Sequence, residues 1–225
     1  MHEPSVPPSH PIAPSSIPRA SVGRLSLYLR ELRRLSDAGE KHVSSKRIGE
    51  LLGVSDSIVR RDLGYLSPRG KRGVGYQIDS LVRQICWLLG SNESWNVVLV
   101  GAGSLGKALL NYPGFQQQGF RWVAAFEIDE TKLNDHNAAI PIFSNDQLER
   151  QIVARSANLA VLAVPATAAG EMARRLSAAG IAAILNFAPV VLQVPADVCV
   201  ANVDLASELQ QLVYNVLSRA SDDPP

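Results

Sequence analysis

A glycine-rich turn near the middle of the chain constrains the fold more than any other feature. Mostly apolar residues at 96–100 lead directly into this turn, whose form is G-x-G-x-x-G, and a helical pattern follows it. In this context Gly101 permits the tight turn, Gly103 lets the backbone approach a pyrophosphate, and Gly106 lets helix and strand pack closely. The phosphates would lie at the helix N-terminus, so the turn predicts a dinucleotide site. Its residues are Gly101, Ala102, Gly103, Ser104, Leu105 and Gly106.

An acidic residue ends the next expected strand, at 122–127. Glu127 lies 21 residues after Gly106, close to the spacing at which an acid holds the adenosine ribose, and Asp129 is the alternative for that role. A carboxylate there repels a 2′-phosphate, so we expect NADH and NAD+ rather than their phosphorylated counterparts. The alternative interpretation is that the glycines serve only a tight turn between a strand and a helix.

The chain from 95 to 204 alternates short apolar runs with helical stretches. The expected strands are 96–100, 122–127, 140–143, 159–164, 183–186 and 198–202. Near-continuous apolar strands separated by helices indicate a parallel sheet covered on both faces. We therefore expect an α/β protein with a Rossmann doubly wound parallel sheet over 95–204, followed by an amphipathic helix.

The segment at 19–78 has the pattern of a winged helix, a helix-turn-helix followed by a β-wing. Apolar residues within 25–35 recur at spacings of three and four, which indicates one helix. Ser44 or Ser45 can cap a second helix, and Gly53 breaks it before a third helix begins. Two short helices joined by a turn that contains glycine are typical of a helix-turn-helix.

The basic charge of the chain is concentrated in this N-terminal segment. Residues 19–76 contain 13 Lys or Arg and 6 Asp or Glu, whereas the rest of the chain contains 9 and 15. Glycines and cations interleave at 68–76, as in a β-wing, before a linker helix at 79–94. A basic helix-turn-helix with a wing indicates binding to double-stranded DNA, and a merely solvated charged face is the alternative.

The third helix and the wing carry the cations that can reach DNA. Arg60 and Arg61 suit bidentate contacts with guanine in the major groove, while Ser57 and Lys46 suit phosphates. Arg61 and Asp62 can instead form part of an internal ion pair. The wing cations can enter a minor groove or follow phosphates. The candidate DNA-contacting residues are Ser44, Ser45, Lys46, Ser57, Arg60, Arg61, Lys71 and Arg72.

The sequence lacks residues that several classes of protein require. Cys86 and Cys199 are far apart and suit neither a zinc site nor a disulfide framework, so any redox sensing must come from a cofactor. No Tyr is followed by Lys four residues later, and His136 is the only His of the second domain, so we expect no catalytic residue and no enzyme. Without about 18 consecutive apolar residues or a secretion signal, a cytoplasmic location is expected. Residues 1–18 contain six prolines and are expected to form a disordered tail.

Further stretches of the sequence stand in a recognisable order within 17–217. They are VSSK at 43–46, VRRDL at 59–63, GKRGVGY at 70–76, the glycine turn, LNYPGF at 110–115, AVLAVPA at 160–166, ILNFAPV at 184–190 and NVDL at 202–205. Together they resemble the Rex family of bacterial redox-sensing repressors. The resemblance implies a homodimer that binds a palindromic operator while NAD+ dominates, and that closes and releases the operator when NADH binds. It also implies a C-terminal helix, at 205–220, that is swapped onto the partner subunit.

The resemblance further implies roles for single residues. Arg30 of the first helix, Tyr112 and the partner's Asp204 form a polar link that couples the nicotinamide state to the angle between the domains. The alternatives are a half-buried aromatic for Tyr112 and a helix cap for Asp204. Glu127 stands where the family usually has Asp, which shifts the ribose contact by a methylene. The expected walls of the nicotinamide end follow strands and are Val164, Pro165, Asn186, Phe187 and Pro189.

A different class of protein is the alternative to a repressor. An NAD-dependent oxidoreductase, or a CoA-type nucleotide-binding protein, could carry the same glycine turn beside a basic accessory domain. Turnover of NADH with a substrate would favour that alternative, whereas release of an operator by NADH would not.

Overall fold

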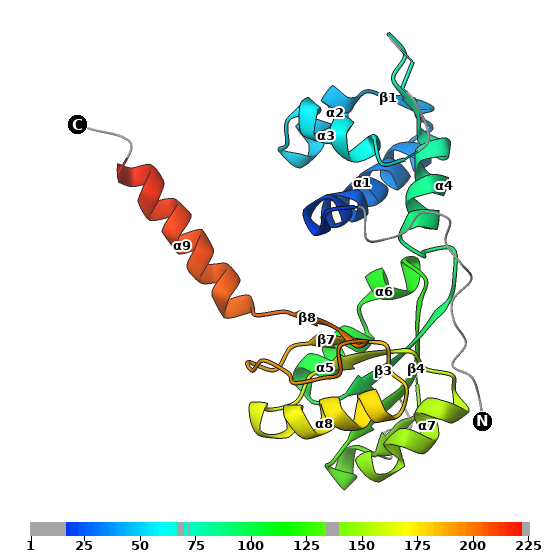
Figure 1. Cartoon of the computed structure of the whole chain (residues 1–225), viewed down its shortest axis with the longest axis vertical. Helices are drawn as coiled ribbons and strands as arrows, with labels where there is room; N and C mark the ends of the chain where they lie inside the picture. The colour runs from blue at the N-terminus through cyan, green and yellow to red at the C-terminus, as the bar shows by residue number, and fades with distance from the viewer. Residues whose placement is uncertain (1–16, 67–69, 72, 134–139, 222–225) are drawn as a thin grey trace. The chain divides into compact units, whose positions relative to one another are not determined.

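The computed structural model describes residues 17–66, 70–71, 73–133 and 140–221, and the chain divides into two compact units after Glu93 (Figure 1). Most of the expected tail at 1–18 lies outside the described residues, as do Arg72 and His136. Ile17, which we expected in the tail, is buried. None of the described helices is long and apolar enough to cross a membrane.

The first unit is a small helical domain with a two-stranded sheet. Its elements are α1 (Arg19–Asp37), β1 (His42–Val43), α2 (Ser45–Leu52), α3 (Asp56–Leu63), β2 (Tyr76–Gln77) and α4 (Ile78–Leu88). The apolar stripe of α1 is buried as expected, with Leu25 and Leu32 fully covered. It forms one core with α2, α3 and α4. The expected linker helix, α4, therefore contributes Ile78, Leu81 and Ile85 to the core of this unit.

Serine side chains fix where the two short helices begin. The Ser44 hydroxyl accepts a hydrogen bond from the Arg47 amide at 3.1 Å, so Ser44 rather than Ser45 is the cap of α2. The Ser55 hydroxyl accepts from the Ile58 amide in the same way at the start of α3. Gly53 ends α2 in a left-handed conformation. The pair α2 and α3 is the expected helix-turn-helix.

The wing precedes β2, which pairs with β1. β1 pairs antiparallel with β2, with Val43 opposite Tyr76. Above this pair, Lys71 and Gly75 exchange backbone hydrogen bonds of 2.9 Å in each direction. Gly75 has φ +88°, and a Cβ there would overlap the carbonyl oxygen of Val43. The close approach of β1 and β2 therefore requires glycine at this position.

The second unit is built on a six-stranded parallel sheet. Its strands are β3 (Trp95–Val100), β4 (Phe120–Glu127), β5 (Ile142–Ser144), β6 (Leu159–Leu162), β7 (Ala183–Asn186) and β8 (Cys199–Asn202). All neighbours are parallel, and the order is β5-β4-β3-β6-β7-β8. This is the doubly wound order, which reverses between β3 and β6. The expected α/β fold is confirmed, with strand ends that differ from the expectation by up to two residues.

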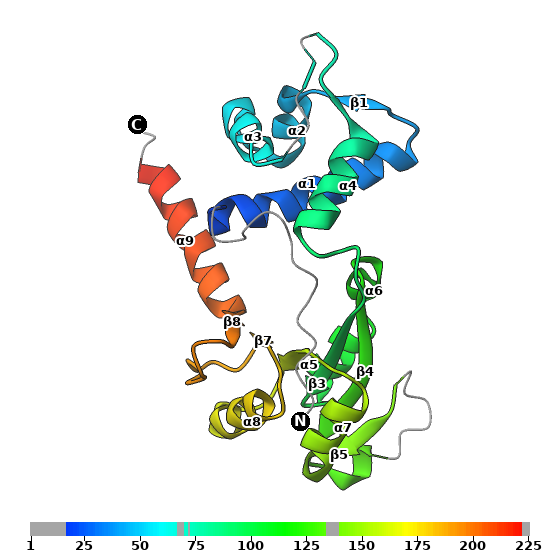
Figure 2. The same ribbon diagram turned by 45° about the vertical axis from the view of Figure 1, so that its right-hand side comes forward.

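Helices cover both faces of this sheet. On one face α7 (Leu148–Ala154) and α8 (Ala166–Ala178) pack against residues such as Val98, Val100 and Phe126 (Figure 2). On the other face α5 (Ser104–Leu110) and α6 (Pro113–Gln117) cover Val97 and Leu99. Short 3-10 helices, η2 (Glu130–Lys132) and η3 (Asn145–Gln147), follow β4 and β5.

The last helix, α9 (Leu205–Ser221), differs from the others because its apolar residues are exposed. Their exposed fractions lie between 57% and 70%. Among the described residues, no element of the chain covers this apolar face. It consists of Leu205, Leu209, Leu212, Val213, Tyr214, Val216 and Leu217.

Replacing the cap of α2 is expected to destabilise the first unit. Ser44→Ala removes the acceptor for the Arg47 amide and should lower the free energy of unfolding by about 1 kcal/mol. Urea unfolding followed by circular dichroism measures this loss. Ser45→Ala is the matched control, since Ser45 is already helical, and should change stability by less than about 0.5 kcal/mol. Equal losses in the two variants would contradict the assignment of the cap.

Candidate functional site

The register of the parallel strands brings three chain turns to the same level. Val100 lies beside Phe126 of β4 and Leu162 of β6, so Gly101, Glu127 and Ala163 lie at the same edge of the sheet. Gly101 has φ +97°, and a Cβ there would overlap the carbonyl oxygen of Ala163. A Cβ at Gly106 would overlap the carbonyl oxygen of Gly101, whereas one at Gly103 would meet open space. Gly101 and Gly106 are therefore required by close backbone contacts, whereas Gly103 leaves room for a ligand to approach.

A cleft of about 650 Å³ opens at this end of the sheet, beside the point where the strand order reverses. Five of the predicted cofactor residues line it, namely Gly101, Gly103, Glu127, Val164 and Pro165. Open α/β sheets bind ligands at this position, outside the carboxyl ends of the strands. The other lining residues are Ile128, Glu130, Ser144, Asn145, Asp146, Ala163, Ala168, Glu171, Met172 and Arg175.

Glu127 and Asp129 have different environments, which separates the two candidates for the ribose acid. Glu127 is 8% exposed, and its Oε1 accepts hydrogen bonds from the amides of Ile128 at 2.9 Å and Asp129 at 3.2 Å. Its carboxylate is thus held at the wall of the cleft. The Asp129 carboxylate instead accepts from the amide and hydroxyl of Thr131, and Asp129 does not line the cleft. The geometry favours Glu127.

Sequence reasoning missed the part of the wall that follows β5. Ser144 lies opposite Glu127 in the register of β5 and β4, and η3 continues from it into the cleft. Asn145 accepts a hydrogen bond of 2.8 Å through its carbonyl oxygen from Arg175 of α8. The rule that carboxyl ends of parallel strands gather at one edge could have found Ser144, because it directly follows the strand expected at 140–143.

Arg175 carries the positive charge among the described residues of the cleft wall, and an acid of α7 neutralises it. Its Nε and Nη2 donate to the two carboxylate oxygens of Glu149 at 2.7 and 2.8 Å. These hydrogen bonds lower the pKa of the Glu149 carboxyl against an opposing effect of burial. Because the other charged residues of the wall are Glu127, Glu130, Asp146 and Glu171, the cleft is acidic, and an extra phosphate on the ribose would be repelled.

Eight other residues predicted to bind the cofactor do not line the cleft. Asn186 is fully buried, and its Nδ2 donates to the carbonyl oxygens of Ala188 and Val190 and to the side-chain oxygen of Asn202. It therefore holds the loop between β7 and β8. The cofactor roles of residues away from this wall stay predictions, for Ala102, Ser104, Leu105, Gly106, Asp129, Asn186, Phe187 and Pro189.

The cations predicted to meet DNA lie on the surface of the first unit. Arg60 and Arg61 of α3 are both exposed, and Arg60 forms an ion pair of 2.7 Å with Asp56 one turn earlier. Lys46 at the start of α2 and Lys71 in the wing are exposed as well. An exposed pair between residues four apart contributes little, so Arg60 can exchange Asp56 for another acceptor. Arg72, the second wing cation, lies outside the described residues.

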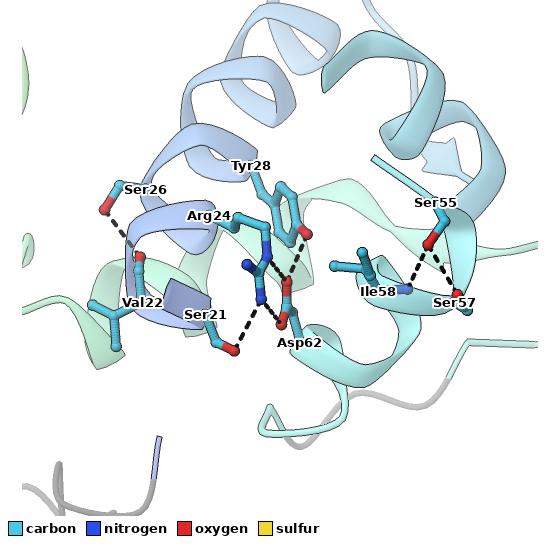
Figure 3. A network of polar contacts seen from close by, with 9 residues as sticks. All are labelled: Ser21, Val22, Arg24, Ser26, Tyr28, Ser55, Ser57, Ile58 and Asp62. Carbon is cyan, nitrogen blue, oxygen red and sulfur yellow. Dashed lines mark hydrogen bonds and ion pairs between the residues drawn. The ribbon is translucent and has the colours of Figure 1, made fainter. Parts of the chain in front are cut away.

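The alternative in which Arg61 pairs with Asp62 is wrong, because Asp62 has other partners. Its carboxylate is fully buried and accepts two hydrogen bonds from Arg24 of α1, from Nε at 2.6 Å and from Nη2 at 2.8 Å (Figure 3). The hydroxyl of Tyr28 donates to the same carboxylate at 2.7 Å. Burial raises the pKa of Asp62, but the hydrogen bonds from Arg24, Tyr28 and Ser21 outweigh it, so the pKa lies below its ordinary value. Asp62 is therefore ionised at neutral pH, and Arg61 faces outward.

The three residues of the predicted switch have local contacts that leave them accessible. Arg30 of the first unit is 69% exposed beside Glu31. In the second unit Tyr112 is 58% exposed and meets the edge of the Phe115 ring. Asp204 accepts from the amides of Ala206 and Ser207 at the start of α9, so the alternative role as a helix cap is realised. A cap does not exclude the switch, which stays a prediction.

Within the described ranges, no three His, Cys, Asp or Glu side chains are grouped as metal ligands. Cys86 is buried in the first unit and Cys199 is exposed in the second, and both are free.

Family models match both units of the chain. Residues 16–64 match a family described as "Putative DNA-binding protein N-terminus", and residues 92–190 match one described as "CoA binding domain". The first match covers the helix-turn-helix, and the second covers the glycine turn and the cleft.

Curated relatives of similar length span nearly the whole chain. Proteins named redox-sensing transcriptional repressor Rex are 47% identical in Rhodopirellula baltica and 44% identical in Streptomyces avermitilis. The first alignment covers 88% of this chain and 84% of the relative, and the second covers 92% and 82%. A relative of the same name in Desulforamulus reducens is 42% identical over 89% of this chain and 95% of its own length.

Solved structures of one Rex-family repressor, RSP, have the same fold as this chain at 31% sequence identity. RSP in complex with β-NAD+ and operator DNA has a TM-score of 0.84, covering 91% of this chain and 94% of RSP. RSP in complex with β-NADH has a TM-score of 0.81, covering 91% and 96%. The relatives are named as regulators rather than as enzymes. The chain belongs to the Rex family of redox-sensing transcriptional repressors.

Proposed function

We propose that this protein is a repressor that binds an operator through α3 and the wing and leaves it when NADH occupies the cleft of the second unit. The observation that carries the proposal is the acidic cleft at the glycine turn, in a chain whose other unit presents exposed arginines on a helix-turn-helix. The solved complexes of RSP with β-NAD+ and operator DNA, and with β-NADH, support the same pairing of ligands.

The cleft accounts for the choice of dinucleotide. The Glu127 carboxylate lines the cleft, where it can accept hydrogen bonds from the adenosine ribose. The pyrophosphate would lie against the Gly103 backbone, where nothing stands within 4 Å of an added Cβ. The acids around the cleft favour NAD+ and NADH over cofactors with a third phosphate.

The response to NADH requires a difference in affinity between two states of the protein. A ligand shifts an equilibrium only as far as it binds one state better than the other. NADH and NAD+ differ in the nicotinamide ring, so the discriminating contacts lie at that end of the cofactor, towards Pro165 and the loop that Asn186 holds. The proposed coupling runs through Arg30, Tyr112 and the partner's Asp204.

A second copy of the chain is the proposed partner of α9. Seven large apolar side chains exposed by more than half need cover, and family membership makes a homodimer with a swapped α9 the natural occupant. A two-fold dimer reads two half-sites, which predicts a palindromic operator. A protein that acts on operator DNA works where the genome lies, and we propose a cytoplasmic location on that ground.

The proposed domains divide the chain by function. A winged helix over 19–78 reads DNA, a linker helix over 79–94 joins it to the Rossmann domain over 95–204, and 205–220 forms the dimer. Because α4 shares a core with α1, we expect the linker helix to move together with the winged helix.

The proposed function is tested by binding to a palindromic duplex that the purified protein selects from a random pool. Fluorescence anisotropy of this duplex is followed while NADH and, separately, NAD+ are added. We expect NADH to release the duplex at concentrations where NAD+ has little effect. Tight DNA binding that neither cofactor changes would overturn the proposed role as a sensor. A protein that selects no duplex would overturn the proposed role as a repressor.

The assignment of Glu127 to the ribose predicts a change in cofactor choice. Hydrogen bonds to a charged group contribute about 1.5–3 kcal/mol, so Glu127→Gln should weaken NADH binding about tenfold or more and narrow the preference over NADPH. Titration of NADH fluorescence measures both affinities. Asp129→Asn, the matched control beside the cleft, should keep the wild-type affinities, and the reverse pattern would assign the ribose to Asp129.

The two kinds of DNA contact predict different effects of removing a cation. Arg60→Ala should lower affinity for the selected duplex by about 1–3 kcal/mol and relax the base preference, because it removes a base contact. Lys46→Ala should weaken binding to selected and random duplexes alike, because it removes a phosphate contact. Equal losses on both duplexes for Arg60→Ala would show that Arg60 contacts phosphate.

A further inference from the structure

A buried carboxylate lies on the helix that carries the exposed arginines. Asp62 is fully buried, whereas Arg60 and Arg61, the two residues before it on α3, are exposed. Successive residues of a helix are turned by about 100° around its axis. The direction of the Asp62 side chain therefore determines the directions of both arginines.

The partners of Asp62 all come from one face of α1. Arg24 and Tyr28 are four residues apart and so lie one above the other on that helix. Together they donate three hydrogen bonds of 2.6 to 2.8 Å to the two oxygens of Asp62 (Figure 3). Arg24 is itself held by the Ser21 hydroxyl at 3.2 Å.

Apolar packing alone defines the rotation of α3 less sharply than this group does. Val59 and Leu63 bury the inner side of α3, but hydrophobic contacts have no preferred direction. A bidentate contact between a guanidinium and a carboxylate fixes both distance and plane. Buried ion pairs are weak evidence for stability, because apolar side chains of similar volume often serve as well. The group therefore needs a role besides stability.

We propose that Asp62, held by Arg24 and Tyr28, is a positioning residue for DNA recognition that sets the rotation of α3 and so aims Arg60 and Arg61 at the bases. The inference rests on the proposed binding of operator DNA by this face. The same contacts keep the only carboxylate of the last turn of α3 away from the phosphates of DNA. Without them, α3 can remain folded and attract DNA by charge while its arginines meet the bases poorly.

The variants that test the proposal keep the size of each side chain. Tyr28→Phe removes one hydrogen bond to Asp62 and preserves the ring. Asp62→Asn removes the charge and preserves the shape. Arg24→Lys keeps the charge but cannot donate two parallel hydrogen bonds. Ile85→Val is the control, because Ile85 is fully buried in the same core on α4 and has no polar atom with which to bond to this group.

The measurement is the ratio of affinities for the selected palindromic duplex and a random duplex, at a temperature where circular dichroism shows each variant folded. For Tyr28→Phe, Asp62→Asn and Arg24→Lys we expect the ratio to fall about tenfold or more, with the affinity for random duplex and its salt dependence within about twofold of wild type. NADH affinity should be unchanged. Ile85→Val should lower the melting temperature and keep the ratio.

Each outcome decides the question. A melting temperature that falls with an unchanged ratio would show that the group only stabilises the fold, and equal losses on both duplexes would show a general loss of binding. Either result would overturn the inference. If Asp62→Asn does not fold, Tyr28→Phe still decides. A wild-type protein without preference for any duplex would overturn the proposed function itself, which separates that failure from this one.

Discussion

The close passage of the Gly101 backbone beside the Ala163 carbonyl, at the boundary between β3 and β6, is the contact on which the nucleotide site depends. There the strand order reverses, so the chain turns after β3 and β6 lead to opposite sides and leave a cleft between them. The parallel register then places Glu127 and Ser144 at the same level. A side chain at position 101 would push β3 and β6 apart and remove the cleft with them.

The two units expose charges of opposite sign at their candidate binding surfaces. In the nucleotide unit, acids line the cleft and the guanidinium of Arg175 is neutralised by Glu149, which leaves a surface that accepts hydroxyl groups better than extra phosphates. In the DNA unit, the carboxylate of Asp62 is buried and neutralised by Arg24, which leaves Arg60 and Arg61 as the exposed charges before it. The nucleotide unit thus neutralises a cation and presents acids, whereas the DNA unit neutralises a carboxylate and presents arginines.

Most of the fold could be predicted because strands and turns depend on residues close together in the sequence. Side-chain contacts between residues far apart in the sequence could not be predicted. The apolar runs located all six strands, and the glycines located the turn after β3, because both depend on neighbours in sequence. The partners of Asp62, Arg24 and Tyr28, are 38 and 34 residues away in the sequence. The residues around Asp62 do not indicate that it binds them rather than the neighbouring Arg61. For the same reason the sequence did not predict the hydrogen bonds that Asn186 makes within its own loop. Arg175 was missed because its partner, Glu149, lies on another helix.

Energetic coupling between the cleft and the DNA face must be reciprocal, and that reciprocity can be measured. If NADH lowers the affinity for operator by some factor, operator must lower the affinity for NADH by the same factor. We would measure NADH binding by calorimetry with and without a saturating amount of the selected duplex. We expect the duplex to weaken NADH binding, by the same factor by which NADH weakens binding of the duplex. An NADH affinity that is the same with and without the duplex would contradict this expectation.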